Sequence, residues 1–127
     1  MNIVCLNGRY LDEREAKISV SDAGFLFGEG IYETLRTVNG KLMNVEAHLE
    51  RLEKSAAQLA IPLPRGIERW TEQTVKRNKF KGEARIRITV SGGVHGFGEP
   101  SNKATVLVTA VPLSPVGVRR ARGVSVI

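Results

Sequence analysis

Alternation of apolar and polar residues marks much of the first third of the chain as strands. Residues 2–12 (NIVCLNGRYLD) hold two short apolar runs around an Asn-Gly pair at 7–8, which favours a hairpin because both residues tolerate positive φ. Residues 31–38 (IYETLRTV) also alternate, and a second Asn-Gly pair at 39–40 predicts another hairpin turn. We expect a short strand at residues 17–20 (KISV) as well.

The last third of the chain adds further strand patterns. In residues 84–90 (ARIRITV), arginines alternate with isoleucines, which indicates one polar and one apolar face. Residues 103–113 (KATVLVTAVPL) are almost continuously apolar, as in the central strand of a sheet. The glycine-rich loop 91–102 (SGGVHGFGEPSN) lies between them. Residues 117–127 (GVRRARGVSVI) begin another strand, so we expect this chain to be the N-terminal piece of a longer protein.

Two segments between these strands have the period of amphipathic helices. Residues 44–59 (NVEAHLERLEKSAAQL) place an apolar stripe along one side, with Asn44 as the N-cap and Glu46 in the first turn. The stripe consists of Val45, Leu49, Leu52, Ala56 and Leu59. Residues 65–78 (RGIERWTEQTVKRN) predict a second helix, which begins after a segment that contains two prolines.

The order of these elements is hairpins, helix, helix and then more strands. Because this order contains no repeating βαβ unit, it predicts an α+β fold: a two-layer domain with a largely antiparallel sheet and two helices on one face. We assign residues 1–116 to this domain, and residues 117–127 to an interdomain linker and the start of a C-terminal domain that the chain lacks.

Composition excludes several functional classes. No apolar run reaches the roughly 18–20 residues of a membrane helix, and the N-terminus lacks a signal-peptide pattern, so we expect a cytoplasmic protein without a membrane partner. Two histidines and one cysteine without ligand-like spacing predict no metal site. The net charge of +6 and the basic run VRRARG suggest a nucleic-acid-binding module as a competing hypothesis, but no interleaved aromatic and basic surface supports it.

Two positions are candidates for chemistry, and each also has a purely structural interpretation. Arg51 lies on the flank of the first predicted helix beside His48. It is either a solvated arginine or an anion ligand, since its planar fork matches two phosphate oxygens. His95 stands in the glycine-rich loop, either as an exposed residue or as a substrate contact. The glycine pattern FLFGEG lacks a P-loop lysine and a βαβ unit, so it predicts a turn.

Residues 21–59 carry a specific combination of motifs. The pattern D-x-G-x-x-x-G-[DE]-G-x-[YF]-E is followed by N-G and then by H-L-x-R-L-x-x-S-A. With these motifs the chain resembles the N-terminal domain of the fold-type IV, or class IV, pyridoxal-phosphate-dependent aminotransferases. The resemblance extends from the LNGRYL hairpin to GVSVI. This family contains branched-chain aminotransferases, D-amino-acid aminotransferases and aminodeoxychorismate lyases.

The resemblance implies roles for individual residues. Arg51, the arginine of H-L-x-R-L, is expected to contact the phosphate of pyridoxal 5'-phosphate, and His48 is expected to have a supporting role. Tyr32 and Arg87 are expected to line the substrate pocket. His95 matches a substrate-binding histidine of the D-amino-acid members, but the arginine that accompanies it there is absent, which favours an L-amino-acid substrate.

The resemblance also implies what the chain lacks. The family's Schiff-base lysine is expected beyond Ile127, so no catalytic residue is assigned and the 127-residue chain is expected to be inactive alone. The full-length protein is expected to be a homodimeric aminotransferase that transfers an amino group between an amino acid and a 2-keto acid in amino-acid metabolism. The alternative is aminodeoxychorismate lyase, which forms p-aminobenzoate and pyruvate for folate synthesis.

Overall fold

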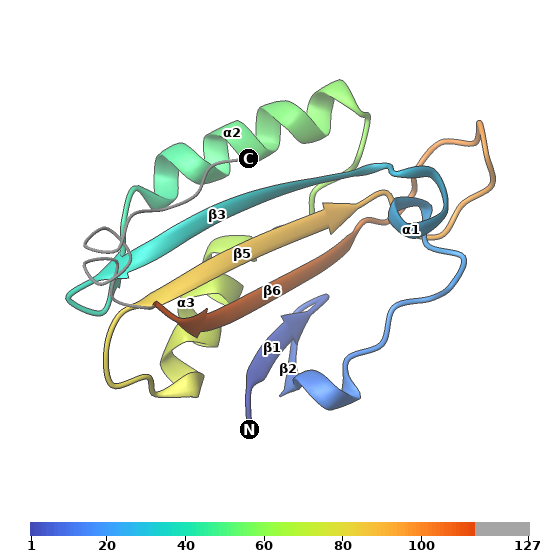
Figure 1. Cartoon of the computed structure of the whole chain (residues 1–127). Helices are drawn as coiled ribbons and strands as arrows, with labels where there is room; N and C mark the ends of the chain where they lie inside the picture. The colour runs from blue at the N-terminus through green and yellow to red at the C-terminus, as the bar shows by residue number, and fades with distance from the viewer. Residues whose placement is uncertain (114–127) are drawn as a thin grey trace, which may run out of the picture.

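A six-stranded sheet forms one layer of the domain, and the computed structural model describes the chain over residues 1–113 (Figure 1). The strands are β1 (Ile3–Leu6), β2 (Arg9–Asp12), β3 (Gly30–Val38), β4 (Lys41–Leu42), β5 (Ala84–Ser91) and β6 (Thr105–Pro112). Their order in the sheet is β2-β1-β6-β5-β3-β4, and every pairing is antiparallel. The apolar segment predicted as a central strand is β6, which pairs with both β1 and β5.

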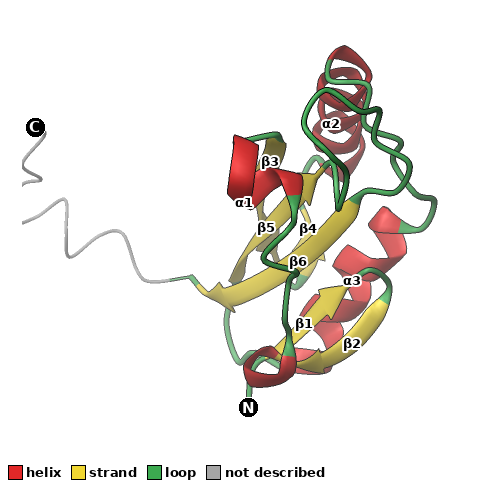
Figure 2. Ribbon diagram, turned by 90° about the vertical axis from the view of Figure 1, so that its right-hand side faces the viewer, coloured by secondary structure: helices red, strands yellow, loops and turns green. Residues whose placement is uncertain are grey.

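Helices form the second layer. The main ones are α2 (Val45–Gln58) and α3 (Ile67–Asn78), and Figure 2 shows both on the same side of the sheet. A short helix, α1 (Ala23–Phe27), lies at one end of the sheet, and a 3-10 turn, η1 (Glu13–Glu15), follows β2. This arrangement confirms the predicted α+β fold. No helix in residues 1–113 is long and apolar enough to span a membrane.

The two predicted hairpins are confirmed, and their backbone angles explain why each turn contains an Asn-Gly pair. Asn7 and Gly8 have φ values of 52° and 84°, and Asn39 and Gly40 have values of 52° and 76°. A two-residue turn of this kind requires positive φ at both positions, which asparagine and glycine adopt most easily. The turns therefore set the register of β1 against β2 and of β3 against β4.

The hydrophobic core lies between the sheet and the two long helices. Alternation along β5 and β6 sends Ile88 and Val108, which are paired across the strands, to the helix side, where both are fully buried. Leu52 of α2 and Ile67 of α3 complete the same cluster. On β5 the opposite face therefore carries Arg85, Arg87 and Thr89, whereas β6 adds both polar and apolar side chains to it.

Three sequence predictions are corrected or fall outside the described residues. Residues 17–20 do not form a strand, because they run from η1 to α1 without a neighbouring strand to bond, and Ile18 and Val20 remain exposed. Asn44 does stand at the N-cap of α2, but its φ is 54° and its side chain makes no capping hydrogen bond. The strand and linker predicted at residues 117–127 lie outside residues 1–113.

Candidate functional site

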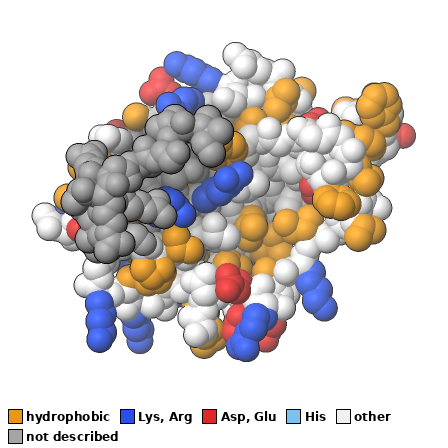
Figure 3. All heavy atoms as spheres, in the orientation of Figure 1, with side chains coloured by type: hydrophobic (Ala, Val, Ile, Leu, Met, Phe, Trp, Pro, Cys, Tyr) orange, Lys and Arg blue, Asp and Glu red, His pale blue; other side chains and the backbone are white. Residues whose placement is uncertain are grey.

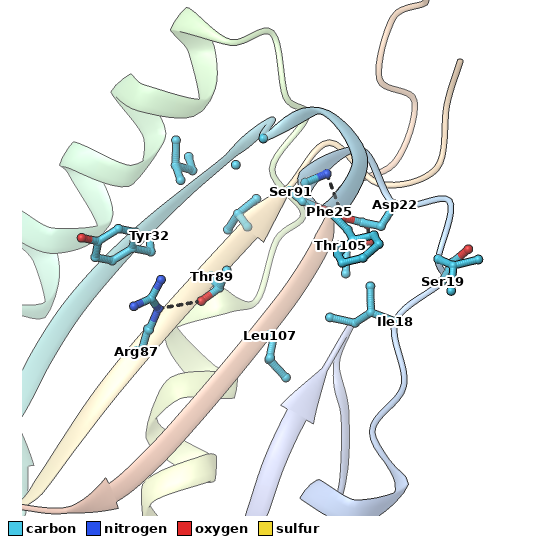
Figure 4. Close-up of a pocket in the computed structure, with 16 residues that line it drawn as sticks. Ile18, Ser19, Asp22, Phe25, Tyr32, Arg87, Thr89, Ser91, Thr105 and Leu107 are labelled. Carbon is cyan, nitrogen blue, oxygen red and sulfur yellow. Dashed lines mark hydrogen bonds between the residues drawn. The ribbon is translucent and has the colours of Figure 1, made fainter. Parts of the chain in front are cut away.

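A hollow of about 500 Å³ opens on the sheet face that the long helices leave uncovered (Figure 4). Residues from β3, β5 and β6 form its floor, and the segment around residues 18–25 forms one wall. Its lining includes Ile18, Asp22, Phe25, Tyr32, Arg87 and Thr105. Figure 3 shows hydrophobic side chains gathered toward the α1 end of this face. The hollow is therefore mostly apolar, with a few polar groups at defined places.

Asp22 ties the wall of the hollow to its floor. Its Oδ2 accepts a hydrogen bond from the backbone N–H of Gly24 at 2.9 Å, which caps α1. Its Oδ1 accepts from the hydroxyls of Ser91 and Thr105, each at 2.8 Å. Gly24 lies so close to β5 that a Cβ atom there would lie 2.7 Å from the Cβ of Ser91. The D-x-G part of the motif is thus explained by packing, and the Asp22 carboxylate is fully used as a structural acceptor.

Tyr32 and Arg87 meet on the open face, as Figure 4 shows. The guanidinium carbon of Arg87 lies 4.0 Å from the centre of the Tyr32 ring, which is a cation–π contact. Arg87 also donates from Nε to the hydroxyl of Thr89 at 3.2 Å. Within residues 1–113 no carboxylate forms a salt bridge with Arg87. The arginine is therefore oriented by neutral partners, and its positive charge is not neutralised by a neighbouring acid.

Arg51 lies on the helix side of the sheet, outside the hollow. Its Nε and Nη2 donate to the two carboxylate oxygens of Glu33 at 2.9 Å and 2.6 Å. Nδ1 of His48, one helical turn before Arg51, lies 2.7 Å from the same carboxylate. The Glu33 side chain is only 7% exposed, whereas that of Arg51 is 67% exposed. Glu33 therefore anchors an arginine whose charge still faces solvent.

Arg51 and Tyr32 approach the same edge of the sheet from opposite faces. Tyr32 and Glu33 are consecutive in β3, so their side chains point to opposite sides. In the described part of the chain, β4 pairs only with residues 37–38 of β3. At Tyr32 and Glu33, β3 is therefore the edge of the sheet. The structure thus brings Tyr32 and Arg87 together and places Arg51 around the edge from them.

His95 is held away from the hollow by two acceptors. Its Nε2 lies 2.5 Å from a carboxylate oxygen of Glu29, and its Nδ1 lies 2.8 Å from the carbonyl oxygen of Gly96. A neutral imidazole has only one N–H, so only the protonated ring donates to both. The Gly96 carbonyl and the Glu29 carboxylate raise the pKa of His95. In this arrangement His95 joins the β5–β6 loop to the turn before β3, and its contact with substrate stays a prediction.

The His95 contact predicts a pH-dependent link between these two loops. Because the folded-state pKa is raised, the link is complete below the ordinary histidine pKa of about 6.5 and is lost as pH rises through the folded value. We expect NMR titration of the imidazole to give a pKa above 6.5. Glu29→Gln should lower it more than Glu99→Gln, since Glu29 contacts the imidazole directly, whereas Glu99 bonds only the backbone N–H of Gly96 and reaches the imidazole through its charge. A wild-type pKa at or below 6.5 would contradict this assignment.

Sequence reasoning missed Glu29 and Glu33 as members of the site. A signal for Glu33 was present, because alternation along β3 places it on the same face as Leu35 and Thr37, which are buried. A carboxylate on a core-facing position requires charged or hydrogen-bonding partners. Glu29 is the acidic position between the two glycines of the family motif, but the motif gave no indication that its partner is His95.

The family assignment rests on residues 30–126, which match the family model described as amino-transferase class IV. The chain belongs to this family. The matched segment begins at β3 and includes Tyr32, Glu33, Arg51 and Arg87. The match thus includes Tyr32-Glu33 and the H-L-x-R-L motif, whereas Asp22, Gly24 and Glu29 of the first motif precede it.

Class IV relatives of different activities are similar to the chain. A putative branched-chain-amino-acid aminotransferase of Methanocaldococcus jannaschii is 34% identical over 119 residues, which is 89% of this chain and 41% of the relative. A D-alanine aminotransferase of Staphylococcus epidermidis is 42% identical over 84% of this chain and 40% of its own length. An aminodeoxychorismate lyase of Bacillus subtilis is 34% identical, with 89% and 41% covered. The chain thus spans about 41% of the length of these curated relatives.

A solved aminotransferase structure contains the same fold. The PLP-bound form of a hypothetical aminotransferase from Mycobacterium tuberculosis matches 94% of this chain with a TM-score of 0.78 and 30% sequence identity. The match covers 42% of that protein. The described domain therefore has the fold of one part of a larger class IV enzyme.

Proposed function

We propose that the full-length protein is a pyridoxal-phosphate-dependent aminotransferase that transfers an amino group between an amino acid and a 2-keto acid. In this proposal residues 1–116 form its N-terminal domain, and the reacting lysine lies outside residues 1–127. Family membership together with a guanidinium fixed at the edge of the sheet carries the proposal. The similar aminotransferase from M. tuberculosis has a PLP-bound form, which supports the choice of cofactor.

The chemistry of Arg51 fits the phosphate of this cofactor. Nε and one N–H of Nη2 are used by Glu33, so the rest of the donor fork is directed away from that carboxylate. The hydrogen bond with Glu33 raises the pKa of Arg51, so the guanidinium stays charged. A fixed, charged fork with exposed donors suits two phosphate oxygens. We therefore assign Arg51 as the phosphate anchor that this domain contributes.

The open face supplies the substrate side of the proposed site. When bound, the cofactor serves as an electron sink for the carbon that loses its proton. Arg87 offers its charge to a substrate carboxylate, and Tyr32 fixes the orientation of that guanidinium. The apolar hollow beside them excludes water from a hydrophobic side chain. The Glu29–His95 link keeps the β5–β6 loop in place at the end of this face.

A homodimeric assembly in the cytoplasm belongs to the same proposal. Its structural support is the set of exposed hydrophobic side chains around α1 and the β5–β6 loop. Phe25, Phe97 and Val94 are 77%, 85% and 64% exposed. Exposed apolar groups gathered in one region are typical of a surface that another domain or subunit covers.

Aminodeoxychorismate lyase activity is the second candidate, because one relative with that name is 34% identical over 89% of the chain. Both activities use an anionic substrate, so Arg87 serves either. The transferase is preferred because branched-chain and D-alanine aminotransferases are among the relatives. The absence of an arginine at Gly93 still favours an L-amino acid within that class.

The full-length protein loaded with pyridoxal phosphate tests the proposal. We expect single-turnover absorbance changes when an apolar L-amino acid is added, and regeneration of the original spectrum with a 2-keto acid. D-alanine tests the opposite stereochemistry in the same assay. Formation of p-aminobenzoate and pyruvate from aminodeoxychorismate without a keto acid would favour the lyase. Absence of both reactions in cofactor-loaded protein would refute the proposal.

A further inference from the structure

We propose that Glu33, supported by His48, is a positioning residue that orients Arg51 for a phosphate group. The inference rests on the proposed function, since Arg51 is taken as the phosphate anchor. It assigns a role to a buried carboxylate that does not line the hollow. Its basis is the geometry of the three side chains and the burial of Glu33 within the core-facing side of β3.

The burial of Glu33 requires an explanation. Its neighbours on the helix face of β3, Leu35 and Thr37, are 3% and 1% exposed, and Glu33 is 7% exposed. A carboxylate at such a position loses most of its hydration, which is unfavourable unless donors replace the water. Three contacts replace it: two from Arg51 and one from His48. The hydrogen bond from Arg51 lowers the pKa of Glu33, so the carboxylate remains ionised.

The contact with Glu33 fixes an arginine that is otherwise free to move. Arg51 projects from α2 with 67% of its side chain exposed, and an exposed arginine samples many rotamers. The side-by-side bonds from Nε and Nη2 hold the plane of the guanidinium in one orientation. An oriented donor loses less conformational freedom when a phosphate binds. Glu33 is thus expected to increase phosphate affinity through geometry.

Charge alone predicts the opposite effect of Glu33. A carboxylate beside the anchor carries the same sign as a phosphate, so its field weakens phosphate binding. Replacing Glu33 with glutamine removes that negative charge. If electrostatics governed the site, Glu33→Gln would therefore bind phosphate more tightly. If positioning governs it, the variant binds more weakly, because the amide nitrogen cannot accept a hydrogen bond from Arg51 or His48. The sign of the change distinguishes the two cases.

The phosphate interaction is measured by a ratio of two affinities of the full-length apoprotein. This ratio is the affinity for pyridoxal 5'-phosphate divided by the affinity for pyridoxal, which lacks the phosphate. Both affinities come from absorbance or fluorescence titration. We expect Glu33→Gln to lower this ratio by about tenfold, the loss typical of one charge-assisted hydrogen bond. Pyridoxal affinity should stay unchanged, whereas a general folding defect lowers both affinities. Lys54→Ala is the matched control, because Lys54 is also exposed on α2 and pairs only with Glu50.

A double-variant test links Glu33 to the guanidinium of Arg51. A lysine ammonium is a point charge without a fork, so Arg51→Lys removes the group that Glu33 orients. We expect Glu33→Gln to have no further effect on the ratio in the Arg51→Lys background. If Glu33→Gln does not fold, His48→Gln decides the question, with an expected loss of about two- to fivefold because the contact of the imidazole with the Glu33 carboxylate is replaced while both bonds from Arg51 remain.

The outcomes separate this inference from the proposed function. If wild-type protein does not prefer pyridoxal phosphate over pyridoxal, the proposed phosphate anchor fails. If Arg51→Ala abolishes the preference while Glu33→Gln leaves it unchanged or increases it, Arg51 is the anchor and the positioning role of Glu33 is refuted. An unchanged ratio in His48→Gln, when Glu33→Gln cannot be prepared, refutes it as well.

Discussion

Replacing Arg51 with alanine should weaken the binding of pyridoxal phosphate to the full-length protein by about 10- to 100-fold. Arg51 offers a charged donor fork, and a charge-assisted hydrogen bond contributes roughly 1.5–3 kcal/mol. The loss appears directly in a spectroscopic titration of the apoprotein. Lys54→Ala removes one positive charge from the same helix and should leave the affinity nearly unchanged. Equal losses in the two variants would point to general electrostatic attraction instead of a specific anchor.

The same replacement has a second effect on stability. Glu33 lies on the core-facing side of β3 and would lose two of its three hydrogen bonds, and a poorly partnered carboxylate there is unfavourable in the folded state. The thermal unfolding temperature should therefore fall in Arg51→Ala. Removing both groups in Glu33→Gln/Arg51→Ala should recover part of this loss, because no uncompensated charge remains. The cofactor affinity of the double variant should not recover, which separates stability from anchoring.

Replacing Gly93 with alanine should destabilise the domain by about 3 kcal/mol or more. Gly93 has a φ of 76°, and a Cβ atom there would overlap the backbone carbonyl oxygen of Lys103. The Gly93 carbonyl also accepts the backbone N–H of Ala23 at 2.7 Å, which ties the β5–β6 loop to α1. Displacing the loop therefore disturbs the wall of the hollow as well. Chemical denaturation measures the change in the free energy of unfolding.

Two other glycines separate the causes of this destabilisation. Gly98, in the same loop, has a φ of 80° but open space around its Cα, so Gly98→Ala should cost only the roughly 1–2 kcal/mol of the left-handed backbone. Gly82 has neither feature, and Gly82→Ala should be close to neutral. If Gly93→Ala were no worse than Gly98→Ala, the clash with Lys103 would be irrelevant.

Local patterns were sufficient for most elements because they depend on neighbouring residues. Alternation identified β3 and β5, a nearly continuous apolar run identified β6, and helical periodicity identified α2 and α3 to within a few residues. The same reasoning failed at residues 17–20, where a strand needs a partner that the fold does not provide. Strand formation is a property of pairing, so a short alternating run is not enough.

The candidate site was only partly accessible to such patterns. The helical period placed Arg51 on the flank of α2 but did not identify the group that it binds. The family resemblance suggested a cofactor phosphate as its ligand. The structure added Glu33, which lies 18 residues away in sequence and fixes the guanidinium. It also showed that His95 contacts the carboxylate of Glu29, 66 residues away in sequence, and is not a free side chain in the loop.

The sequence by itself determined the class of fold, the apolar face of β5, most of the apolar stripe of α2 and the motifs of the class IV family. Leu59 is the exception in that stripe, because it lies at the C-cap and is 43% exposed. These properties are encoded at spacings of two to four residues, which a single chain segment contains. Tertiary structure alone decided which charged groups meet: Glu33 with His48 and Arg51, Glu29 with His95, and Arg87 with the ring of Tyr32. Such pairings depend on how distant segments pack, because only packing brings their side chains within hydrogen-bonding distance and removes the competing water.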